Sequence, residues 1–65
     1  MSEQEARALA ADIERTPGWL AEVFEGATSE RWYLVVGHVA DPGTNFVLRS
    51  PRDWERLCEL LSDDA

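Results

Sequence analysis

The stretch "RWYLVVGHV", residues 31–39, is rich in the β-branched and aromatic residues that favour a β-strand. Successive side chains of a strand point to opposite faces of its sheet. One face would carry Trp32, Leu34 and Val36, and the other would carry Tyr33, Val35 and Val39. Both faces of this strand are therefore apolar, and in so small a protein the question is what covers each of them.

The size of the chain limits how much it can bury. Its 65 residues form a single domain, 1–65, and a domain this short buries roughly 60% of the surface that its unfolded chain exposes. Such a core leaves on the order of 3–5 kcal/mol of stability unless a disulfide, a metal or a partner adds to it. The only cysteine is Cys58 and the only histidine is His38, so one chain can form neither a disulfide nor a Cys/His zinc site. Association remains as a source of stability.

The charge balance indicates which partners to expect. Thirteen acidic residues against six arginines and no lysine give a formal net charge of −7. Proteins that grip nucleic acid through its phosphates need a basic patch, so we expect no direct nucleic-acid binding. Residues 1–10 lack the basic start and apolar run of a signal peptide, and no apolar stretch approaches the ~18 residues of a membrane span. We therefore expect no membrane association, and with a single free thiol we expect a cytoplasmic protein.

Two helices are predicted, one near each end of the chain. Ser2 and Glu5 have the Ser-x-x-Glu spacing of a capping box, which predicts a helix start, and an ion pair is expected between Glu3 and Arg7. The Thr-Pro-Gly sequence at 16–18 ends this helix. Its apolar stripe consists of Ala6, Leu9, Ala10 and Ile13. These mostly small side chains would let the helix lie close to a sheet.

The second helix is the more strongly amphipathic of the two. Ser50 is the predicted N-cap, Pro51 suits the first helical position, and Asp53 follows three residues after the cap. The stripe that follows consists of Trp54, Leu57, Cys58 and Leu61, with Leu60 at its edge. Two aspartates near the negative end of the helix dipole predict a frayed tail over residues 62–65.

Between the helices the sequence predicts three strands. They cover residues 18–25, 31–39 and 45–49, with a loop at 26–30. The sequence "DPGT", residues 41–44, has proline and glycine at its centre, which predicts a hairpin turn. The predicted fold is a small α+β domain of α-β-β-β-α order, in which two helices pack with a three-stranded antiparallel sheet.

The double-stranded-RNA-binding domain has this same order of elements, but no sequence motif supports the analogy. Such domains contact phosphates through lysine-rich loops and a basic second helix. The corresponding helix here has the sequence "PRDWERLCELL", with three carboxylates against two arginines.

Alternation along the strands separates a core face from an opposite face. The core set avoids a central carboxylate in the first strand and an arginine in the second. It consists of Trp19, Ala21, Val23, Trp32, Leu34, Val36, Phe46 and Leu48. The opposite face then carries Leu20, Phe24, Tyr33, Val35, Val39 and Val47, edged by Glu22, Arg31 and Arg49.

This opposite face is too apolar to remain in contact with water, and patches of this kind usually mark an interface. The sequence leaves two arrangements open, because the helices either share one face or cover one face each. If they share a face, the uncovered side is a candidate partner interface. Its predicted residues are Leu20, Glu22, Phe24, Arg31, Tyr33, Val35, Val47 and Arg49.

No residue pattern indicates catalysis, so we expect no enzyme and assign no catalytic, cofactor or metal residues. His38 is interpreted as a strand-end residue, and Cys58 as a buried, inert thiol on the second helix. A Cys58–His38 dyad has no motif to support it. The three tryptophans are interpreted as core residues and not as a stacking platform for bases or sugars.

The sequence therefore predicts a small acidic interaction or assembly module that forms a homodimer through a sheet face. The alternative is a role linked to nucleic acid. In that case the acidic surface would imitate a phosphate backbone, or the chain would be a degenerate RNA-binding fold.

Overall fold

The computed structural model describes residues 1–62 and has the predicted α+β fold, with two helices and a three-stranded antiparallel sheet. Its elements are α1 (Glu3–Glu14), β1 (Trp19–Phe24), β2 (Tyr33–His38), β3 (Asp41–Leu48) and α2 (Pro51–Ser62). The strands follow one another across the sheet in the order β1-β2-β3. The frayed tail was predicted from residue 62, which is the last residue of α2, and residues 63–65 lie outside the described part.

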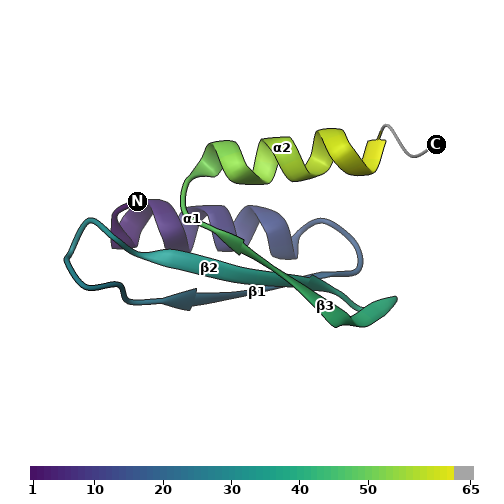
Figure 1. Ribbon diagram of the computed structural model, residues 1–65, viewed down its shortest axis with the longest axis horizontal. Coiled ribbons are helices and arrows are strands. Elements are labelled where there is room, and N and C mark those ends of the chain that lie inside the picture. Colours follow the sequence, from purple (N-terminus) through teal and green to yellow (C-terminus); the bar gives the residue numbers. More distant parts are fainter. Residues whose placement is uncertain (63–65) are drawn as a thin grey trace.

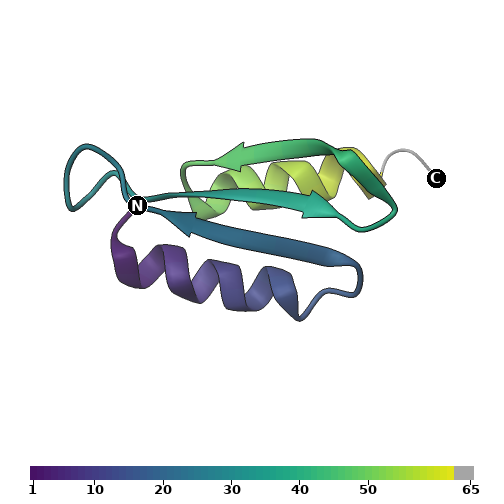
Figure 2. The same ribbon diagram turned by 90° about the horizontal axis from the view of Figure 1, so that it is seen from below.

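Both helices lie on the same face of the sheet, which decides between the two arrangements left open by the sequence. Figure 1 shows α1 and α2 together above the strands, and Figure 2 shows the strands from below, in front of α2. The buried core lies between these layers and consists of Ala6, Leu9, Ile13, Leu34, Val36, Leu48 and Leu57. The other face of the sheet has no helix over it.

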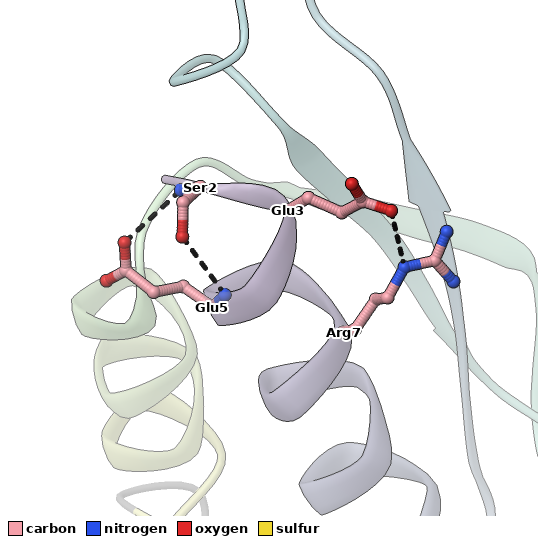
Figure 3. A network of polar contacts seen from close by, with 4 residues as sticks. All are labelled: Ser2, Glu3, Glu5 and Arg7. Carbon is pink, nitrogen blue, oxygen red and sulfur yellow. Dashed lines mark hydrogen bonds and ion pairs between the residues drawn. The ribbon is translucent and has the colours of Figure 1, made fainter.

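The capping box that begins α1 is present as predicted (Figure 3). The Glu5 N–H donates to Ser2 Oγ at 3.2 Å, and the Ser2 N–H donates to Glu5 Oε1 at 3.2 Å. The Ser2 backbone N–H that donates to the ionised carboxylate, and after it the Ser2 side chain, hold the pKa of Glu5 below its usual range. The expected ion pair is also formed, with Arg7 Nε 2.9 Å from Glu3 Oε2.

The chain leaves α1 through Gly18, the residue that precedes β1. Gly18 has φ +88°, a left-handed conformation that favours glycine. The His38 ring packs against it so closely that an added Cβ would lie 2.5 Å from Nε2. Gly18 therefore has two independent reasons to be a glycine.

Helix α2 begins at Pro51 as predicted, but its start and its end differ in detail from the prediction. Asp53 Oδ2 accepts from the Arg49 N–H at 2.8 Å, one residue before the expected cap. Leu57 is buried, whereas Leu61 is 47% exposed. Leu61, predicted in the apolar stripe of this helix, is therefore not part of the buried core and instead lines an open hollow with Trp19 and Phe46.

The β2–β3 connection lies earlier in the chain than predicted. Asp41–Thr44 belongs to β3, and the chain reverses at Val39–Ala40. His38 pairs with Asp41 while Gly37 pairs with Asn45, so the proline and glycine form a bulge and not the turn. The Ala40 N–H donates to His38 Nδ1 at 3.0 Å, which helps to fix the earlier turn. The prediction of a turn at 41–44 was wrong, because proline and glycine suit a bulge at an edge strand equally well.

The predicted core face of the sheet is confirmed. Leu34, Val36 and Leu48 are buried, and the other predicted members pack against them while partly buried. These other members are Trp19, Ala21, Val23, Trp32 and Phe46. Alternation along each strand was sufficient to separate the two faces.

Candidate protein-interaction face

We call the side of the sheet turned away from both helices the outer face. Its strand positions are Leu20, Glu22, Phe24, Tyr33, Val35, Gly37, Asn45 and Val47. Leu20 is 61% exposed and Val47 is 54% exposed, although both are aliphatic. Apolar side chains gathered on one uncovered sheet face are typical of an interaction surface.

The strand register arranges these residues in rows across the sheet. Glu22, Val35 and Val47 form the middle row, because Val35 pairs with both of its neighbours. One outer row joins Phe24 and Tyr33, and the other joins Leu20, Gly37 and Asn45. The outer face thus has a mostly apolar middle row, and its two ends differ from each other.

The first end carries an aromatic pair and two arginines. The rings of Phe24 and Tyr33 stack with centroids 5.5 Å apart and planes 15° apart. Arg31 and Arg49 lie just outside β2 and β3, and with Tyr33 they line a hollow of about 450 Å³ at this end. The two predicted edge arginines therefore lie together at one end of the outer face.

The second end is hollowed. Gly37 occupies an outward position of the central strand and has no side chain of its own, and the end of the Asn45 side chain lies beside it. The hollow has a volume of about 520 Å³ and is bordered by Leu20 and Val35 on the sheet and by Val39 and Asp41 at the turn. Val39 was predicted on the strand itself, but it lies in the turn and contributes to the wall of this hollow.

The two ends also differ in charge. Arg31 and Arg49 lie at the aromatic end, whereas Asp41 lies at the hollow end. Glu22 is exposed in the middle row on β1, a strand at the margin of the sheet. The two arginines of the outer face therefore lie at one end and Asp41 at the other, while Glu25 and Glu30 lie in the connection beyond the aromatic end.

His38 and Cys58 are not brought together as a catalytic pair. The Nδ1 atom of His38 accepts a backbone hydrogen bond, and the ring packs edge-on against Trp19 with centroids 5.1 Å apart. Cys58 is half-buried on α2, less enclosed than predicted, and within residues 1–62 no hydrogen bond joins the two side chains. A histidine held by a backbone bond and an aromatic contact has a structural role at the end of β2.

The tryptophans belong to the helix side of the sheet. Trp19 packs edge-on against Trp54 with centroids 5.3 Å apart, and Trp32 packs against the core with Arg7 Cζ 6.0 Å from its ring centroid. None of the three therefore lies on the outer face, where the aromatic groups are the exposed Phe24 and the half-buried Tyr33.

No cluster of three or more metal-ligating side chains occurs within residues 1–62. Over the same residues, neither helix is long and apolar enough to cross a membrane. The acidic side chains described are all at least partly exposed, and the buried residues include no charged group.

Comparisons with known proteins found no relative of this chain. No model of a known protein family matches the chain, and no curated protein or solved structure matches it either. Its function has to be argued from the surface alone.

Two features of the outer face were not predicted from the sequence. Gly37 lies on the same face of the strand as Tyr33 and Val35, so alternation alone places a gap on the outer face. The gap was not predicted, because the predicted interface included only positions with side chains. Asp41 was assigned to a turn, and only the register places it beside the hollow.

Proposed function

We propose that this chain is a small cytoplasmic interaction module that assembles through its outer face into a two-fold symmetric homodimer. One observation carries the proposal. Both helices cover the same face of the sheet, and the uncovered face is the one with the exposed aliphatic and aromatic side chains. A domain of 65 residues has a small core, so burying this face adds stability that the monomer lacks.

The residues have different roles in this assembly. The apolar anchors are Leu20, Phe24, Tyr33, Val35 and Val47. Glu22, Arg31 and Arg49 form a charged rim that sets the register of the two copies. The unpaired margin of β3 is a poorer docking site, because Pro42 and the bulge disfavour pairing with another strand.

The dimer is expected to be weak. Three strands about 4.8 Å apart and about 20 Å long project on the order of 300 Å². Two such faces bury roughly 600 Å² in total, below the ~1,200 Å² at which standard specific interfaces begin, so the contact is small. We therefore expect association that depends on concentration, with a dissociation constant around the micromolar range.

Light scattering across a concentration series, with two matched substitutions, tests the proposal. Leu20 is 61% exposed on the outer face and Leu60 is 69% exposed on α2. Leu20→Glu should give a monomer at concentrations where the native chain is a dimer, because it places a charge inside the interface. Leu60→Glu makes the same chemical change elsewhere and should leave the dimer intact. A native chain that stays monomeric throughout, or a dimer lost only in Leu60→Glu, would contradict the proposal.

The same experiment at several salt concentrations separates this function from a role linked to nucleic acid. A phosphate mimic would bind a basic partner, and that complex would weaken steeply with salt. Association through an apolar face should change little. Helix α2 does not favour the nucleic-acid role, since Asp53, Glu55 and Glu59 outnumber its two arginines.

A further inference from the structure

We infer that the two copies meet with their sheets face to face about a two-fold axis that crosses the strands above Val35, so that the aromatic end of each copy enters the Gly37 hollow of the other. This inference rests on the proposed homodimer and specifies its geometry. It follows from three features of the outer face: the spacing of its rows, its shape and its charges.

The spacing comes from the register. On β2, Tyr33 and Gly37 are each two residues from Val35, in opposite directions. On β1, Phe24 and Leu20 are each two residues from Glu22, which pairs with Val35. A two-fold axis over the middle row and perpendicular to the strands therefore places each end of one copy over the other end of its partner.

The shapes of the two ends match under this rotation. Tyr33, stacked on Phe24, comes over the hollow of about 520 Å³ that Gly37 leaves open. Packed sheets usually cross at about 30°. This rotation shifts a residue that is two positions from the axis sideways by about 3 Å, which is less than the spacing between strands. The aromatic pair thus stays above the hollow for an ordinary crossing angle.

The arginines and Asp41 at the two ends match as well, whereas the same axis brings the two copies of Glu22 near each other in the middle row. The axis brings Arg31 and Arg49 of each copy toward the end of the partner that carries Asp41. Opposite charges at the borders that come into contact favour this alignment over others.

A second two-fold arrangement, with the axis parallel to the strands, is the main competitor. It would place each end over the same end of the partner, with Gly37 facing Gly37 across a void and the two Tyr33 rings competing for the same space, while Phe24 on β1 would face β3 of the partner. It would also bring four arginines together at one border and two copies of Asp41 together at the other. Shape and the placement of the arginines therefore disfavour it, although this arrangement would keep the two copies of Glu22 apart.

Crosslinking distinguishes the two arrangements. Facing sheets lie about 10 Å apart, too far for a disulfide, so a short bismaleimide is the suitable reagent. The variants are made in a Cys58→Ala background whose fold and mass are checked first. Val35→Cys should crosslink to itself because it lies on the axis. A mixture of Phe24→Cys and Leu20→Cys, one of them tagged, should give the mixed pair and neither like pair.

Filling the hollow is a second test, because the two arrangements predict opposite changes in the affinity of the dimer. Gly37→Val suits a strand, and its Cβ would meet only the end of the Asn45 side chain, at 2.9 Å, and the Thr44 carbonyl, at 3.4 Å. The monomer should therefore fold normally. The dissociation constant of the dimer should rise about tenfold or more, because the valine side chain would occupy the space that Tyr33 of the other copy enters. In the competing arrangement the same substitution fills a void and tightens the dimer.

The outcomes separate this inference from the proposal beneath it. The mixed crosslink together with a weakened Gly37→Val dimer supports the crossing axis. A dimer that persists without the mixed crosslink, and that Gly37→Val tightens, overturns the inference but leaves homodimerisation standing. No crosslink of Val35→Cys and no association of the native chain at any concentration overturns both.

Discussion

Gly18 shows how one residue combines backbone and packing requirements. Its φ of +88° and the nearby His38 ring both exclude a side chain. Gly18→Ala should lower the free energy of unfolding by about 2 kcal/mol, since a left-handed alanine alone costs about 1–2 kcal/mol and the ring must also move. Gly43→Ala is the control, because its added Cβ would meet nothing within 4 Å, and its stability should be unchanged or slightly higher. Equal urea midpoints for the two variants would show that this account of Gly18 is wrong.

Glu22 is the residue whose charge the proposed dimer tolerates least well. The axis over the middle row brings the two copies of Glu22 near each other at the margin of the interface. Glu22→Gln should tighten the dimer by about two- to fivefold, the range expected for an exposed pair of like charges. Analytical ultracentrifugation measures the change, and Glu25→Gln, outside the strands, is the matched control. A weaker dimer in Glu22→Gln would mean that this carboxylate makes a favourable contact instead.

At the scale of single elements, the helices were easier to predict than the connections. Ser2 and Glu5 define a local motif that depends on neither the sheet nor the other helix. The turn between β2 and β3 depends instead on competition between two local preferences. Pro42 and Gly43 suit a turn, but the bond from the Ala40 N–H to His38 Nδ1 and the pairing of His38 with Asp41 favour the earlier reversal. No periodic pattern in the sequence shows which of these two preferences prevails.

The capping box of α1 gives a prediction that depends on pH. Ser2→Ala should lower the free energy of unfolding by about 1 kcal/mol and return the pKa of Glu5 part of the way to its usual value, because the backbone N–H of residue 2 still donates to the carboxylate. Because the folded pKa is lowered, the contribution of Glu5 is complete above the pKa of the unfolded chain and is lost as pH falls through the folded value. The difference between native and variant chains should therefore shrink in acid.

Urea unfolding at several pH values and an NMR titration of the Glu5 carboxyl measure these effects. Ser29→Ala, in the exposed loop between β1 and β2, is the control and should change neither quantity. A Glu5 pKa that is the same in native and Ser2→Ala chains would show that the capping box does not hold in solution.

At the scale of the whole molecule, the sequence predicted the two faces of the sheet but not how the helices are distributed between them. Leu34 and Val36 alternate with Tyr33 and Val35, so the faces follow from parity alone. Whether α1 and α2 share a face depends on the direction in which the chain leaves β1 and β3, which no side-chain pattern specifies. The outer face could therefore be described residue by residue from the sequence, while its lack of a covering helix required the structure.

The most direct test of the central claim is the concentration dependence of the backbone amide NMR shifts of the native chain. On dilution, the shifts of outer-face residues such as Leu20, Tyr33, Val35 and Val47 should move together along one binding curve. Shifts on the exposed side of α1 should stay fixed. Shifts that do not depend on concentration, or that change around Leu60 on α2 instead, would contradict assembly through the outer face.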